Sequence, residues 1–251
     1  MTLGYQSYGT GAHKVVVLHG WFGDHTMFGP MRHALNTDEF TYVFPAYRGY
    51  GLSRHLSGKY TNAEISADVI ALADEIGLKE FSLIGHSMGG KAIQRVLADA
   101  PGRVRKLVAV TPVPAAAVPF DEAGLQLFEG AAKSIENRKA ILNYSTGNRL
   151  SSRFIDHLAD YSMQTASPEA FAGYFRAWSK EEFVADILGN KTPIKVIVGE
   201  HDPSLTPDIM KATYMEWYPN AELEVMPNAG HYPMDETPIA LATSMENFLK
   251  K

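Results

Sequence analysis

The sequence of 251 residues is long enough to bury the core of one α/β domain, and its 45% hydrophobic and 20% charged content is ordinary for a globular protein. There are 23 basic and 28 acidic residues, which gives a net charge of −5, and no dense run of lysine or arginine occurs. This balance argues against nucleic acid or an anionic membrane as a partner. The absence of cysteine excludes disulfides, thiolate metal sites and a cysteine nucleophile.

The amino terminus has neither the basic region nor the long apolar region of a signal peptide. No stretch approaches the roughly 18 apolar residues of a membrane span. We therefore expect a cytoplasmic protein.

Short apolar stretches recur along the chain and predict strands. They are residues 3–8, 14–18, 41–44, 81–84, 106–111, 194–198 and 222–226. Up to residue 111 these strands alternate with helical patterns, which predicts right-handed parallel βαβ units. The fold class is therefore α/β, with helices on both faces of a mostly parallel sheet.

Two helices carry clear start signals. Thr61 to Glu64 has the pattern of a capping box, and Gly77 ends the helix that follows it. The closing helix has Thr237 as its predicted N-cap and Pro238 in its first turn. Both helices have one apolar face, formed by Ile65, Val69, Leu72 and Ile76 in the first and by Leu241, Met245 and Phe248 in the second.

The pattern changes between residues 112 and 190, where helical segments occur without a convincing core strand. Strands on either side complete one another, so we predict a core domain made of residues 1–111 and 191–251. Residues 112–190 are then a helical cap inserted into the core. Its clearest helix starts at Ser167 and has one aromatic face, formed by Phe171, Tyr174, Phe175 and Trp178.

A serine with a glycine two residues before it and another two residues after it lies between the predicted strand at 81–84 and the helix that follows. This stretch, residues 85–90, has the sequence GHSMGG and is typical of a nucleophile elbow. The tight turn strains the backbone of Ser87, while Gly85 and Gly89 leave room for the crossing chain. Ser87 is therefore the predicted nucleophile.

A serine nucleophile needs a histidine base and a carboxylate that orients the histidine. His231 lies just after the last predicted strand and is the best of the nine histidines for this role. Asp202 also follows a strand, which gives the chain order Ser87, Asp202, His231 that accompanies this kind of elbow. We expect His19 to be a buried support of its loop and His86 to point away from Ser87. The rival carboxylates near Asp202 and His231 are Glu200, Asp208 and Asp235.

Acyl transfer also needs donors for the developing oxyanion. The backbone N–H of Met88 is one candidate, at the positive end of the following helix. Trp21, in the loop after the strand at 14–18, is the candidate for the second, with Phe22 as the alternative. The candidate substrate-binding side chains are Trp21, Phe22, Met88, Phe128, Trp178 and Tyr232.

These motifs together resemble those of the α/β-hydrolase fold superfamily, in the form with a helical cap. The resemblance runs from His19-Gly20 through residues 45–53 and the elbow to residues 199–202 and His231. The elbow and His19-Gly20-Trp21 also resemble the perhydrolase or non-haem haloperoxidase branch of cofactor-free esterases.

The chain departs from the superfamily at two points. It has Ala46 where an aspartate is usual, which affects the hydrogen bonding of that loop. The amino terminus is too short for the first two of the eight usual strands, so we expect about seven. The serine nucleophile argues against the dehalogenases and epoxide hydrolases of the superfamily, which use aspartate.

The predicted function is therefore cleavage of a small to medium, largely apolar carboxylic ester through an acyl-enzyme, without a metal or organic cofactor. Lactonase, C–C bond hydrolase and perhydrolase activities use the same triad and remain alternatives. A ligand receptor built on a hydrolase fold and a non-catalytic interaction protein are the alternatives outside enzymes.

Overall fold

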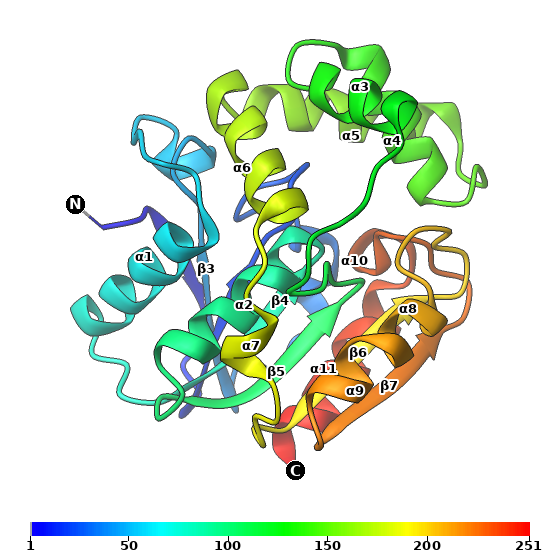
Figure 1. Cartoon of the computed structure of the whole chain (residues 1–251). Helices are drawn as coiled ribbons and strands as arrows, with labels where there is room; N and C mark the ends of the chain where they lie inside the picture. Colours follow the sequence, from blue (N-terminus) through cyan, green and yellow to red (C-terminus); the bar gives the residue numbers. More distant parts are fainter. Residues whose placement is uncertain (1) are drawn as a thin grey trace.

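The computed structural model describes residues 2–251 and is organised around one seven-stranded sheet (Figure 1). The strand order is β1-β3-β2-β4-β5-β6-β7; β1 is antiparallel to β3, and all other neighbours are parallel. The strands are β1 (Tyr5–Tyr8), β2 (His13–Leu18), β3 (Phe40–Pro45), β4 (Phe81–His86), β5 (Val104–Val110), β6 (Ile194–Gly199) and β7 (Ala221–Met226). The predicted α/β class and the sheet of seven strands are confirmed.

Helices cover the two faces of the sheet. On one face α1 (Asn62–Glu75) packs against α2 (Met88–Asp99), and on the other α11 (Pro238–Lys250) packs against the 3₁₀ helix η1 (Gly29–Ala34) (Figure 1). The shorter elements of the core are η2 (Gly51–Ser53), α8 (Pro207–Ala212), α9 (Tyr214–Trp217) and α10 (Pro233–Glu236). None of the described helices combines the length and apolar character that a membrane span requires.

The structure refines both predicted helix starts. Thr61 accepts a hydrogen bond from the Glu64 N–H at 3.1 Å, as a capping box requires. The Glu64 carboxylate, however, accepts from the N–H of Tyr60 and not from that of Thr61, because Tyr60 turns back with φ of 56°. Thr237 occupies the N-cap of α11, but its side chain makes no capping hydrogen bond.

Residues 112–190 consist of helices joined by loops and contain no strand in the part of the chain that the structure describes. The helices are α3 (Glu122–Gly130), α4 (Ile135–Ser145), α5 (Ser152–Thr165), α6 (Pro168–Lys180) and α7 (Val184–Ile187). In Figure 1, α3 to α6 lie above the carboxyl end of the sheet, whereas α7 lies beside α2. The predicted aromatic face of α6 is buried, and Ser167 caps this helix through the N–H of Ala170.

A buried lysine joins α2 to both ends of the helical segment. Lys91 has no exposed surface, and its Nζ donates to the carbonyl oxygens of Ala116 at 2.9 Å and Trp178 at 3.0 Å, and also to that of Glu181. Burial lowers the pKa of Lys91 to about 8 although Glu181 and Glu182 oppose this shift. The ammonium group of Lys91 therefore bonds to a carbonyl before α3, where the chain enters the helical segment, and to carbonyls at the end of α6, where the chain returns to the core.

Replacing Lys91 by Met should leave these buried carbonyls without their donor. Because each unsatisfied buried polar group costs about 1–3 kcal/mol, we expect the free energy of unfolding to fall by about 3 kcal/mol or more. Urea denaturation followed by circular dichroism measures this change. The matched control is Lys79→Met on the exposed surface. Equal stabilities of the two variants would contradict a stabilising role for the hydrogen bonds of Lys91.

Candidate active site

The turn between β4 and α2 places Ser87 in a strained backbone conformation. Its φ is 54° and its ψ is −115°, a region that residues other than glycine rarely adopt. A Cβ on Gly85 would lie 2.3 Å from the carbonyl oxygen of Gly89, and one on Gly89 would lie 2.4 Å from that of Leu18. The two glycines therefore allow the close backbone crossing on which the turn depends.

Ser87, His231 and Asp202 come from three loops at the carboxyl ends of β4, β7 and β6 and meet in one hydrogen-bonded chain. The distance from Ser87 Oγ to His231 Nε2 is 2.9 Å, and that from His231 Nδ1 to Asp202 Oδ2 is 2.6 Å. With a proton on Nδ1 donated to the carboxylate, Nε2 is free to accept the hydroxyl proton of Ser87. This is the geometry of a nucleophile, a base and an orienting carboxylate.

The environment of Asp202 keeps its carboxylate charged. Burial alone would raise its pKa, yet the neighbouring His231 and the backbone N–H groups of Ser204 and Leu205 hold the pKa below its usual value. The N–H groups of Ser204 and Leu205 donate to Oδ1 at 2.9 and 3.1 Å. One oxygen is thus fixed by backbone and the other faces the imidazole.

Two neighbours fix the backbone of His231. Its carbonyl oxygen accepts from His86 Nε2 at 2.8 Å and from Thr111 Oγ1 at 3.0 Å. Burial, and then the proximity of His231, hold the pKa of His86 well below its usual value, so this imidazole is neutral and carries its proton on Nε2. His86 therefore supports the position of His231, and its Nε2 is directed to that carbonyl and not to Ser87.

The other candidates have different contacts. His19 is fully buried, and its Nδ1 and Nε2 pair with the carbonyl of Gly20 and the N–H of Tyr47. Burial lowers the pKa of His19 to about 4. Glu200 accepts from the N–H of Asn228, and Asp208 pairs with Lys211. These contacts are structural, and none of these side chains bonds to the imidazole of His231.

The two predicted oxyanion donors, Trp21 and Met88, are both close to Ser87: Trp21 lines the same cavity, and Met88 is the next residue in the chain. Met88 is the first residue of α2, where a backbone N–H has no acceptor within its helix. The N–H of Trp21 likewise has no hydrogen-bond acceptor among residues 2–251. The carbonyl of Trp21 is held by the hydroxyl of Tyr50 at 2.9 Å, which fixes the orientation of this peptide.

A cavity of about 380 Å³ opens onto Ser87 and His231, within the usual size range of small-molecule sites. Five of the predicted substrate-binding residues line it: Trp21, Phe22, Phe128, Trp178 and Tyr232. The side chain of the sixth, Met88, is 1% exposed and is not part of the lining. It packs beneath the turn, because α2 enters the core immediately after Ser87.

Several lining residues carry no signal in the sequence. They come from the helical segment and from the loop after β6: Val113, Val118, Pro119, Phe120, Ile141, Tyr144, Ser145, Ser204, Leu205 and Ile209. Apart from the histidines, the lining has no basic side chain, and it has no carboxylate. Among residues 2–251, no group of three histidine, aspartate or glutamate side chains is arranged to hold a metal ion.

Comparison with known proteins gives consistent results. Residues 15–243 match the model of a family described as the alpha/beta hydrolase family. A 2-hydroxymuconate semialdehyde hydrolase from Pseudomonas putida is 28% identical over 218 residues, which cover 82% of this chain and 76% of that protein.

Two solved structures are similar over nearly the whole chain. A thermophilic esterase from Thermogutta terrifontis is 27% identical with a TM-score of 0.81, covering 99% of this chain and 93% of its own. A bromoperoxidase from Bacillus anthracis is 22% identical with a TM-score of 0.85, covering 98% and 95%, and shows likeness of fold.

The close crossing at the serine turn predicts a strong response to a single methyl group. Gly89→Ala should lower the free energy of unfolding by about 3 kcal/mol, because the new Cβ meets backbone that cannot move aside. Gly102→Ala is the matched control, since nothing lies within 4 Å of a Cβ there. Urea denaturation of both variants measures the difference, and similar midpoints would show that the crossing is not tight.

Proposed function

Because the chain belongs to the alpha/beta hydrolase family, we propose that it is a serine hydrolase that cleaves a neutral carboxylic ester through Ser87, His231 and Asp202. The observation that carries this proposal is the continuous hydrogen-bonded path from Ser87 through His231 to Asp202, at distances of 2.9 and 2.6 Å, beside an apolar cavity. A hydroxyl with a base in hydrogen-bond contact is the arrangement that nucleophilic acyl transfer requires.

In the first half of the reaction, Ser87 Oγ attacks the ester carbonyl carbon while its proton moves to His231 Nε2. The carbonyl oxygen gains negative charge and accepts hydrogen bonds from the backbone N–H groups of Trp21 and Met88. The tetrahedral intermediate then expels the alkoxide, which takes the proton from His231. Asp202 stabilises the imidazolium throughout, since its carboxylate remains charged.

In the second half, water replaces the departed alcohol. His231 removes a proton from this water as it attacks the acyl carbon bound to Ser87. Collapse of the second intermediate returns the proton to Ser87 Oγ and releases the carboxylic acid. Among residues 2–251, no side chain other than His231 bonds to Ser87 Oγ, so one histidine serves both halves.

The composition of the cavity favours a substrate without charge. Its walls are aromatic and aliphatic, and no lysine or arginine lines it. A substrate carboxylate there would lose water without gaining a cationic partner, which is costly. We therefore assign a small or medium ester with apolar acyl and alcohol groups.

We infer that residues 112–190 act as a cap that closes this cavity. Trp21 supports this role, because its Nε1 donates to the carbonyl of Phe171 at 2.8 Å and its ring stacks on that of Phe171 at 4.0 Å. The same residue lines the cavity together with Ser87. The candidate oxyanion loop is thus held against α6.

Cleavage of a C–C bond is the second candidate, because the Pseudomonas putida relative is named as a hydrolase of 2-hydroxymuconate semialdehyde, a compound without an ester bond. Another relative, from Burkholderia vietnamiensis, is named for a dioate, a dicarboxylate. The uncharged cavity favours the ester over a dicarboxylate. Product analysis distinguishes lactone hydrolysis and perhydrolysis from ester hydrolysis. Single turnover, instead of many turnovers, would identify a ligand receptor.

The first test of the proposal is covalent labelling. A fluorophosphonate should modify the protein at Ser87, and Ser87→Ala should abolish the labelling, both detected by intact mass spectrometry. Turnover of p-nitrophenyl butyrate should fall by about 10⁶ in the same variant. Labelling that persists in Ser87→Ala would contradict the assignment, and single turnover would favour a receptor.

The second test concerns the carboxylate. Asp202→Asn should reduce kcat by about 10⁴, because the amide favours the wrong tautomer of His231 and does not stabilise the imidazolium. Asp208→Asn, on the exposed surface, is the control and should retain activity. Initial rates on p-nitrophenyl butyrate measure both, and a loss below about tenfold in Asp202→Asn would reassign the acid.

The third test concerns substrate charge. We expect kcat/KM for p-nitrophenyl butyrate to exceed that for p-nitrophenyl hemisuccinate by more than about tenfold, since a buried unpaired carboxylate is costly. A preference for the hemisuccinate, or for a vinylogous diketone with carboxylate ends, would favour the C–C hydrolase alternative.

A further inference from the structure

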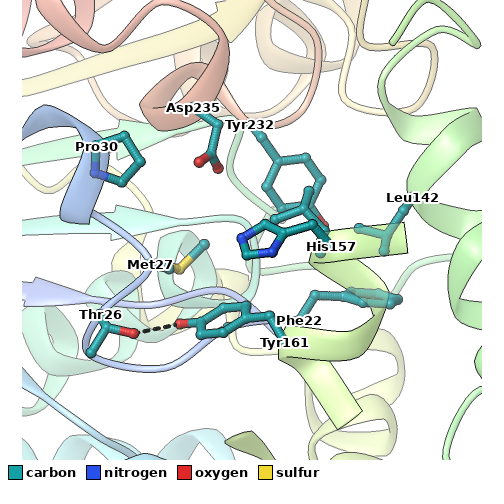
Figure 2. A pocket seen from close by; sticks show the side chains of 11 residues that line it. Phe22, Thr26, Met27, Pro30, Leu142, His157, Tyr161, Tyr232 and Asp235 are labelled. Atoms are coloured by element: carbon teal, nitrogen blue, oxygen red, sulfur yellow. Dashed lines mark hydrogen bonds between the residues drawn. The ribbon is translucent and has the colours of Figure 1, made fainter. Parts of the chain in front are cut away.

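A second cavity of about 200 Å³ lies next to the one that holds Ser87. The two cavities share Phe22 and Tyr232 as a common wall, and the second contains neither Ser87 nor His231 (Figure 2). It lies between the loop after β2, the helices α4 and α5, and the start of α10. No step of the proposed reaction uses it.

Asp235 is the only carboxylate in the lining of this second cavity. Its side chain has no hydrogen-bond or ion-pair partner among residues 2–251. Burial, and then the charge of Glu236, raise the pKa of Asp235 to about 7. A partly buried carboxylate in an open space is thus left without the cation that would offset its desolvation.

The hydroxyls of Tyr161 and Thr26 already have hydrogen-bond partners, and His157 enters the cavity from a different element than Asp235. Tyr161 donates to Asp24 Oδ1 at 2.7 Å, and Thr26 donates to the same oxygen at 2.7 Å. The dashed line in Figure 2 marks the further contact between the Tyr161 and Thr26 hydroxyls, at 3.0 Å. Figure 2 shows Asp235 and His157 extending into the space from different elements.

The other walls are apolar or aromatic. Phe22, Tyr161 and Tyr232 contribute rings, and Met27 and Leu142 contribute aliphatic surface. No lysine or arginine lines the cavity. A carboxylate among aromatic rings attracts an organic cation through charge and through the faces of the rings.

We propose that this second cavity binds a small organic ammonium ion, with its charged nitrogen at Asp235 and its apolar body between Phe22, Tyr161 and Tyr232. The ligand is a primary amine with a compact aromatic or aliphatic group. This site is distinct from the ester site and does not depend on the function proposed for it.

The pH dependence of binding follows from the groups around the cavity. These are Asp235 and His157 in the lining, Tyr161 and Tyr232 with raised pKa values, and Asp24 and Glu236 behind them. Asp235 loses its proton as the pH rises through about 7 and then presents a negative charge to the cavity. Affinity for an ammonium ion should therefore rise between pH 6 and 8.

The experiment compares benzylammonium with benzyl alcohol, which has nearly the same shape without the charge. Titration calorimetry at about pH 8 should show benzylammonium binding to the intact protein at least about tenfold more tightly than benzyl alcohol. Asp235→Asn should weaken the ammonium at least about tenfold and leave the alcohol unchanged. Asp160→Asn, which removes an exposed charge from α5, should change neither.

Two results of these titrations would contradict an ammonium site at Asp235. Equal affinities of the amine and the alcohol, or an unchanged affinity in Asp235→Asn, would overturn the proposal. Binding to the ester cavity is distinguished because Asp235 does not line it, so Asp235→Asn would then have no selective effect. The readout is binding, so loss of esterase activity does not alter the interpretation.

Discussion

The close crossing of α2 over the carboxyl end of β2 is the constraint on which the rest of the site depends. It exists because Gly89 has no Cβ to meet the carbonyl of Leu18, and it holds Ser87 at a positive φ that costs about 1–3 kcal/mol. The same turn brings the N–H of Met88 to the start of a helix, where it has no internal acceptor. One backbone contact therefore positions both the candidate nucleophile and a candidate oxyanion donor.

The helical segment is joined to this turn by buried polar contacts as well as by apolar packing. Lys91, one turn along α2 from Ser87, bonds carbonyls on both chain segments that connect to the helices. Trp21, in the lining of the cavity, donates a hydrogen bond to the carbonyl of Phe171 of α6 and stacks on its ring. Because polar groups buried in this way are costly to separate, these two anchors favour a fixed placement of the helices over the site.

Neighbouring charges and hydrogen bonds separate the roles of three buried histidines near the sheet edge. His19 and His86 are buried, are kept neutral by desolvation, and are used as hydrogen-bonding supports of loops. His231 contacts both Ser87 and the charged Asp202, so its Nε2 can accept a proton from Ser87 while its Nδ1 donates to the carboxylate. Residue type alone does not distinguish these roles, whereas the surrounding charges and hydrogen bonds do.

The sequence alone predicts the seven strands, the longer helices α1, α2, α6 and α11, and the placement of Ser87, Asp202 and His231 just beyond strand ends. Hydrophobic period, turn glycines and strand-end position are local signals, and parallel strands bring their carboxyl ends to one edge. Three features became evident only in the folded chain: which residues of the helical segment line the cavity, the burial of Met88 outside that lining, and the position of Asp235 in a separate cavity. These features depend on how segments distant in the sequence pack against one another. Local periodicity reports only which face of each element is apolar, so it does not predict that packing.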